Sequence, residues 1–167
     1  MAEYGRVVVG ISGSLRGLTA LHRAVAEARH RDSELVGVMT WTPPGGEVAS
    51  RRNSWPPLLE ALENAACERL EQSFRDAFGG CPSGVRCRLT VVRGGPGPVL
   101  ARIAREPEDL LVIGTGRRGS LLRLFHGDVS RYCLAHARCP VLAVPPSELL
   151  HDVGRAARVL DELPPTR

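Results

Sequence analysis

The 167-residue chain carries 22 Lys and Arg against 18 Asp and Glu, which leaves a formal net charge of +4. That excess is small and is mixed with acids along the chain, so the composition gives no argument for a dedicated nucleic-acid surface. All 22 basic residues are arginine, which excludes a lysine Schiff base, a lysine general base and a P-loop lysine.

In chain order, short β-branched runs alternate with segments of helical periodicity, the pattern of a parallel sheet with helical crossovers. Residues 1–146 are expected to form one α/β domain, and residues 147–167 a C-terminal helical tail. Trp41 and Trp55 flank a Pro-rich loop, where we expect a small packing cluster. The sequence predicts strands at 7–11, 35–40, 85–92, 110–113 and 140–144, helices at 15–28, 58–78, 99–104 and 129–137, and the loop at 42–57.

The cysteine spacing and the hydropathy of the sequence indicate the cellular compartment of the protein. The five cysteines lack C-x-x-C spacing, so neither a zinc ribbon nor a closed disulfide framework is expected. Residues 1–6 lack a signal-peptide pattern, and no apolar stretch approaches the roughly 20 residues that span a bilayer. We therefore expect a cytoplasmic protein with reduced thiols and no membrane partner.

The order of the elements also predicts where a ligand binds. Right-handed crossovers favour a doubly wound, five-stranded parallel sheet of strand order 3-2-1-4-5. The winding reverses between the first and the fourth strand, and ligands of such sheets bind at that switch point, outside the carboxyl ends of the strands. The segments expected to meet there are 12–14 and 114–130.

The glycine-rich segment 114–119, Gly-Thr-Gly-Arg-Arg-Gly, matches the dinucleotide motif G-x-G-x-x-G. A dinucleotide loop should follow the first strand and precede an acidic residue by about 20 positions. Here the segment follows the fourth strand, and the next strand ends in Pro145-Pro146. The same segment begins like a P-loop, but Ser120 occupies the position of the lysine. A purely structural turn and a phosphate-binding loop of another kind both stay open.

The turn Val-Gly-Ile-Ser-Gly-Ser at 9–14 and the run His-Ala-Arg-Cys-Pro-Val-Leu-Ala-Val at 136–144 are informative beyond their local structure. With the order of the elements, they resemble the universal stress protein family over about residues 5–146. The resemblance implies an adenine nucleotide alpha hydrolase-like fold and a stress-response regulatory protein. It also implies a homodimer in which the strand Val141–Val144 pairs with the same strand of a second copy. Dimerisation has a physical reason as well, because an exposed apolar edge strand is prone to pair with another chain unless it is covered.

Members of that family that bind ATP resemble one another in a G-x-x-G loop, followed nine residues later by G-[S/T]. In this sequence Gly114 and Gly127 match that pattern, whereas Arg117 replaces the second glycine and Asp128 replaces the Ser or Thr. Ser12 stands where the family usually has aspartate. Carried over residue by residue, the resemblance implies a site for ATP or another adenine nucleotide at Gly10, Ile11, Ser12, Met39, Ile113, Gly114, Arg117, Gly127, Asp128, Val129 and Ser130.

The two charged replacements change the chemistry of this loop. Arg117 loses the close backbone approach that glycine allows, but its guanidinium could reach a phosphate. Asp128, expected at the start of the last helix, would repel a phosphate about 4 Å away by roughly 4 kcal/mol, and a bridging Mg²⁺ would remove that repulsion. The second hypothesis is that Asp128 pairs with Arg117, Arg118 or Arg123 and partly fills the site, so that no nucleotide is bound.

No catalytic set accompanies this loop. The five histidines have no ligand spacing, and Ser12, Ser14 and Ser130 lack a nominated base. An enzyme is therefore not expected, although weak ATP hydrolysis stays open, and no metal site is predicted apart from Mg²⁺ at Asp128. The predicted function is a stress-response regulator with an adenine-nucleotide site; the alternative is a dimeric interaction protein that binds no nucleotide.

Overall fold

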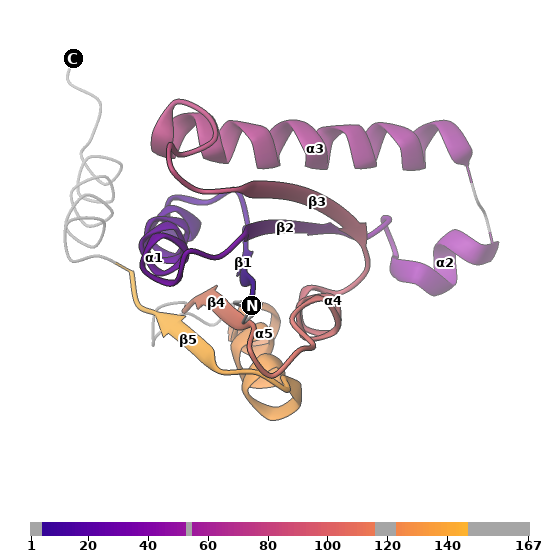
Figure 1. Ribbon diagram of the computed structural model, residues 1–167. Coiled ribbons are helices and arrows are strands. Elements are labelled where there is room, and N and C mark those ends of the chain that lie inside the picture. The colour runs from indigo at the N-terminus through magenta and orange to yellow at the C-terminus, as the bar shows by residue number, and fades with distance from the viewer. Residues whose placement is uncertain (1–4, 53–54, 116–122, 147–167) are drawn as a thin grey trace, which may run out of the picture.

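The computed structural model describes residues 5–52, 55–115 and 123–146 and shows a five-stranded parallel sheet (Figure 1). Its strand order is β3-β2-β1-β4-β5, so the predicted doubly wound sheet is confirmed. Each neighbouring pair of strands runs parallel. The strands are β1 (Val7–Gly10), β2 (Leu35–Trp41), β3 (Cys87–Arg93), β4 (Leu110–Gly114) and β5 (Val141–Val144).

Helices cover both faces of the sheet (Figure 1). Val7 and Val9 of β1 pack in a core with α1 and α3, whereas Val8 packs in a second core with α4 and α5. This division follows from the alternation of side chains along a strand, and it explains why β1 is apolar at consecutive positions. The helices are α1 (Leu15–Arg31), α2 (Gly46–Arg52), α3 (Pro56–Phe78), α4 (Pro96–Ile103) and α5 (Arg123–His136). Among these helices, none combines the length and the apolar character needed to span a bilayer.

The helices after β2 and after β4 differ from the prediction in ways that bear on the site. The segment 42–57 is not one loop, because α2 occupies Gly46–Arg52 and α3 begins at Pro56. An isolated seven-residue helix is marginal in water, and α2 is held by a contact distant in sequence, from Arg93 to Glu47. The last helix begins at Arg123 instead of 129, so Asp128 lies inside α5 and not at its start. The predicted tail, 147–167, lies outside the described residues.

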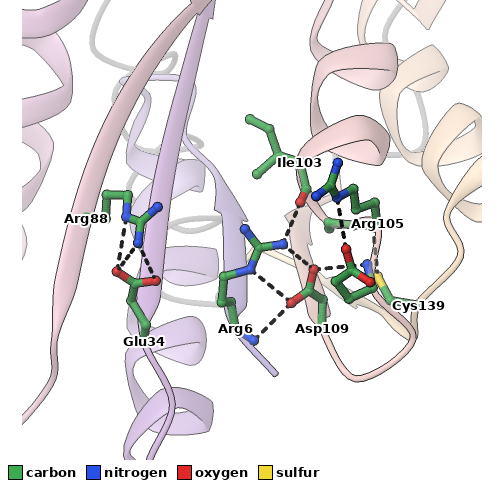
Figure 2. A network of polar contacts seen from close by, with 9 residues as sticks. Arg6, Glu34, Arg88, Ile103, Arg105, Asp109 and Cys139 are labelled. Atoms are coloured by element: carbon green, nitrogen blue, oxygen red, sulfur yellow. Dashed lines mark hydrogen bonds and ion pairs between the residues drawn. The ribbon is translucent and has the colours of Figure 1, made fainter. Parts of the chain in front are cut away.

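A charged network joins the amino ends of β1 and β4 (Figure 2). Asp109 is 1% exposed and directly precedes β4, and Arg6 directly precedes β1. The main-chain N–H of Arg6 donates to Asp109 Oδ1 at 3.0 Å, and the guanidinium donates to Oδ1 and Oδ2 at 3.1 and 2.6 Å. The same guanidinium donates to the carbonyl of Ile103 at 2.9 Å, at the end of α4. Arg6 and Asp109 together therefore join two strands and the end of α4 at the amino ends of the strands, opposite to the predicted site.

Candidate functional site

The switch point lies where β1 and β4 end side by side. These strands pair in the register Val7↔Leu110, Val8↔Leu111 and Val9↔Val112. After β1 the chain enters α1 on one face of the sheet, and after β4 it continues to α5 on the other face. The two connections leave the same edge in opposite directions, which is the arrangement that opens a ligand crevice in α/β sheets.

The loop after β1 has a defined geometry. The N–H of Ile11 donates to the carbonyl of Val38 at 2.8 Å, so the end of β1 stays attached to β2. Gly13 has a φ of 69°, in the left-handed region that favours glycine. Ser14 is the N-cap of α1, and its Oγ lies 2.8 Å from the Oγ of Ser12. Both serines are exposed, so this loop presents two hydroxyl groups to solvent at the sheet edge.

The apolar residues of the predicted site are divided by the sheet. Ile11 and Met39 are buried in the core beneath α1 and α3. Ile113 is buried in the other core, where Val129 of α5 packs against it as a half-buried residue. Met39 also reaches the β1 loop, because its Cε lies 3.8 Å from the position a Cβ would take at Gly13. The structure therefore brings Met39 to the loop after β1.

Gly10 has a packing reason that the sequence did not reveal. A Cβ at this position would lie 2.8 Å from Leu100 Cδ1 of α4, closer than side-chain atoms approach one another. The missing side chain thus lets α4 pack against the end of β1. Gly10 also pairs with Val38 of β2, so the end of β1 is fixed between β2 and α4 at the start of the candidate site.

On the β4 side, the structure describes the strand end and the helix that follows. Gly114 is exposed, and Thr115 extends the pairing with β5 because its N–H donates to the carbonyl of Val144 at 2.8 Å. Arg117 lies outside the described residues. Gly127, Asp128 and Ser130 lie on α5, together with Val129, and Ser130 is half-buried.

The groups described at the carboxyl ends of the strands are uncharged hydrogen-bonding groups. The loop after β1 offers the hydroxyls of Ser12 and Ser14 and contains no carboxylate. Across the described part of the chain, no group of three or more His, Cys, Asp or Glu side chains could hold a metal ion. Hydroxyl and amide groups bind ribose hydroxyls and phosphate oxygens as hydrogen-bond partners. Mg²⁺ at Asp128 stays a prediction.

A neighbouring feature, absent from the sequence prediction, covers the carboxyl ends of β2 and β3. Arg93 donates to both carboxylate oxygens of Glu47 at 3.0 and 2.9 Å and to Ser50 Oγ at 3.0 Å. Its guanidinium carbon lies 5.5 Å from the ring centre of Trp41. The hydrogen bond from Arg93 lowers the pKa of Glu47 below its usual range. The arginine and tryptophan that end two adjacent strands therefore fix α2 in place, beyond the strand ends (Figure 1).

The two tryptophans behave differently from each other. Trp41 is 8% exposed and belongs to the main core beneath α1 and α3, instead of the small separate cluster that the sequence predicts. Trp55 is 63% exposed. It borders a hollow of about 180 Å³ between α2 and the start of α3. The other residues that line the hollow are Pro43, Pro44, Ala49, Ser50, Leu58 and Leu59.

Comparison with known proteins decides the family. Residues 3–145 match the sequence model of the Universal stress protein family. The chain belongs to the universal stress protein family. A universal stress protein of Methanocaldococcus jannaschii is 28% identical over 144 residues, which cover 84% of this chain and 82% of that protein.

Solved structures of universal stress proteins share the fold. UspA from Lactobacillus plantarum superposes with a TM-score of 0.66 at 22% identity, over 86% of this chain and 99% of that one. A universal stress protein in complex with cAMP superposes with a TM-score of 0.56 at 24% identity, over 87% of this chain and 100% of that one. The adenine nucleotide alpha hydrolase-like fold implied by the sequence resemblance is thereby confirmed.

Proposed function

We propose that this universal stress protein is a stress-response regulator that binds an adenine nucleotide at the switch point between β1 and β4. The observation that carries the proposal is the geometry of the loop after β1. Gly13 in the left-handed conformation and the capped start of α1 direct the hydroxyls of Ser12 and Ser14 to solvent at the carboxyl edge. The related structure with cAMP supports a nucleotide of this class.

The nucleotide is proposed as a signal and not as a substrate. The described residues of the edge supply hydroxyl groups and main-chain amides, and no carboxylate or histidine among them stands beside Ser12 to act as a general base. We propose that ligand occupancy changes the surface that a partner meets. A phosphate-release assay with ATP checks this role, because turnover above the rate without protein would assign an enzyme.

Isothermal titration with AMP, cAMP, ADP and ATP, each with Mg²⁺ and with a chelator, tests nucleotide binding. Saturable binding of at least one nucleotide is expected. A dependence on Mg²⁺ would support a metal bridge to the phosphates. Absence of binding and of any thermal shift with all four nucleotides would leave the dimeric interaction protein as the function.

A substitution at Ser12 locates the site. Ser12→Asp introduces the residue usual in the family, and its carboxylate can accept a hydrogen bond from the hydroxyl of Ser14, so the loop should keep its geometry. We expect nucleotide affinity to rise about tenfold, or ~1.4 kcal/mol, because a charged acceptor binds a ribose hydroxyl more strongly. The matched control is Ser83→Asp, which adds the same charge in the loop before β3, at the opposite sheet edge. Equal affinities of the two variants would place the nucleotide elsewhere.

We also propose that the protein is a homodimer formed through β5. This strand lies at one end of the sheet order and pairs with β4 on one side. Its residues are half-buried or exposed, and no other described strand pairs with its outer edge. A second copy of β5 would complete the sheet across a two-fold axis.

A further inference from the structure

Exposed apolar side chains gather around the hollow between α2 and the start of α3. Five large hydrophobic side chains of the described residues are exposed, and three of them lie in this part of the chain. Trp55 and Leu58, which are 63% and 36% exposed, line the hollow. Val48 directly precedes the lining residue Ala49 on α2. Single hydrophobic residues scattered over a protein surface need no explanation, but a group of them around a hollow marks a binding site.

The two walls of this hollow are held by different parts of the fold. Ala49 and Ser50 of α2 belong to one wall. Arg93 holds that wall through its hydrogen bonds to Glu47 and to Ser50 Oγ. On the α3 side, Leu59 packs against the core beneath α1 and α3. The volume of about 180 Å³ leaves room for one ring, since a cavity of roughly 150 Å³ accepts a benzene molecule.

Ser50 brings an unused hydrogen-bond donor to this apolar lining. The buried serines of the described residues are Ser33, Ser50 and Ser73. The hydroxyls of Ser33 and Ser73 donate to main-chain carbonyls, at 3.3 and 2.8 Å. Ser50, 7% exposed, accepts from Arg93 at 3.0 Å, but its own hydroxyl donates to no acceptor among the described residues. A buried donor without an acceptor is costly, so an occupant of the hollow that offers an acceptor is stabilised there.

The charges at this polar end of the hollow cancel. Glu47 accepts two hydrogen bonds from Arg93, so the guanidinium already has its counter-charge. An anion at Ser50 would lie near the carboxylate of Glu47, because both side chains accept from the same guanidinium nitrogen. An apolar anchor from a partner chain, such as a leucine or phenylalanine side chain, has no acceptor for the hydroxyl. The occupant that fits is uncharged, contains one ring and carries an acceptor oxygen.

We propose that the hollow between α2 and α3 binds an uncharged, single-ring aromatic compound that carries a carbonyl oxygen. Ser50 donates its hydroxyl to that oxygen, Arg93 holds Ser50 in place, and the indole of Trp55 stacks on the ring. The site is separate from the candidate nucleotide site, because the described residues predicted to bind the nucleotide do not line the hollow.

Titration of the full-length protein with acetophenone, followed by proton–nitrogen correlation NMR, tests the proposal. The indole N–H of Trp55 and the amides of Ala49 and Ser50 report on the hollow. Trp55→Phe assigns the indole signal, since the chain has two tryptophans. We expect saturable shifts of these signals. Ethylbenzene, the matched compound without oxygen, should shift the same signals, and benzoate should bind about tenfold more weakly than acetophenone because its charge must be desolvated beside Glu47.

Variants on both walls make the test specific. Ser50→Ala removes the donor and leaves the bonds between Arg93 and Glu47 in place. Acetophenone should then bind about fivefold more weakly, as expected for one lost hydrogen bond, whereas ethylbenzene should bind as before. Trp55→Ala should weaken the binding of both compounds. Its control is Leu134→Ala, at an equally exposed position on α5, which should weaken neither.

Several results would overturn the proposal. Acetophenone could cause no saturable shift around the hollow, or benzoate could bind as tightly as acetophenone. Ser50→Ala could weaken both compounds equally or neither, and Trp55→Ala could leave both affinities unchanged. A shift of the reporting signals with protein concentration alone would show that a second copy of the chain fills the hollow, which also contradicts a small-molecule site.

Discussion

Arg6 binds Asp109 through both its main-chain N–H and its guanidinium, and so joins the amino ends of β1 and β4. These are the two strands whose carboxyl ends diverge at the candidate nucleotide site. Asp109 also accepts a hydrogen bond from the N–H of Glu106 at 3.3 Å. One buried carboxylate thus fixes the strand pair at the edge opposite to the site, so the loops at the carboxyl edge are built on a rigid base.

Asp109→Asn should destabilise the fold strongly. The amide can accept from Arg6 at one position only, and the guanidinium is left without its counter-charge in a partly buried place. Breaking a buried pair by removal of one partner costs about 3–5 kcal/mol, and we expect a loss in the lower part of that range because Arg6 is 31% exposed. Urea denaturation at pH 7 measures the loss of unfolding free energy.

The Arg88–Glu34 pair provides the control for this substitution. It is also bidentate, with Arg88 donating to the two carboxylate oxygens at 3.1 and 3.0 Å, but the Arg88 side chain is 60% exposed (Figure 2). Glu34→Gln should therefore cost no more than about 1 kcal/mol. Equal losses of unfolding free energy in Asp109→Asn and Glu34→Gln would show that the buried Asp109 pair stabilises the fold no more than an exposed pair does.

The same carboxylate makes stability depend on pH. Burial raises the pKa of Asp109, but the hydrogen bonds from Arg6 and from the N–H of Glu106 outweigh it and hold the pKa below its usual value. A lowered folded-state pKa contributes stability that is complete above the unfolded value of about 3.9 and is lost as the pH falls through the folded value. Denaturation at several pH values should show the difference between the unsubstituted protein and Asp109→Asn shrinking below about pH 4. A constant difference down to pH 2 would show that Asp109 does not carry this dependence.

The fold was predictable from sequence because its main signals are local. Consecutive apolar residues in β1 and β4 indicate strands buried on both faces, and helical periodicity between strands indicates crossovers. The handedness rule then gives the strand order and the switch point. The N-cap of α1 at Ser14 was predictable for the same reason, because a serine directly before a helical segment is a local sequence signal.

The features that sequence reasoning missed depend on contacts distant in the chain. α2 is short, and the pair that holds it joins Glu47 to Arg93. Gly10 stands out only once Leu100 of α4 is placed against it. α5 begins earlier than the sequence predicts, because the prediction places Gly127 in the loop whereas the helix contains it. The surroundings of single residues therefore need the packed structure, while the position of the switch point follows from the strand order.

Glu47→Gln should release α2 without unfolding the protein. The substitution removes the charge that Arg93 binds at two positions, and a seven-residue helix keeps little structure without such a contact. Hydrogen exchange followed by mass spectrometry should show faster exchange of the α2 amides, with little change in the global denaturation midpoint. Glu71→Gln is the control, since it breaks the exposed pair with Arg75 on α3. Unchanged exchange in α2 would show that other contacts hold this helix.

The proposed dimer can be tested at the main-chain N–H and C=O groups of β5 that face away from β4. The carbonyls of Pro140 and Val144 accept hydrogen bonds from the N–H groups of Leu111 and Thr115, at 3.0 and 2.8 Å. Because main-chain groups alternate along a parallel strand, those of Val141 and Ala143 point to the outer edge, where a second copy would pair. Ala143→Pro removes one outer donor and leaves the bonds to β4 in place.

We therefore expect Ala143→Pro to convert the dimer into a folded monomer. Light scattering after size exclusion measures the mass, and circular dichroism checks that the fold is retained. The control Ala143→Val keeps the N–H group and suits a strand, so its mass should equal that of the unsubstituted protein. A dimer that persists in folded Ala143→Pro would place the interface away from the outer edge of β5. A monomeric unsubstituted protein at micromolar concentration would contradict the dimer itself.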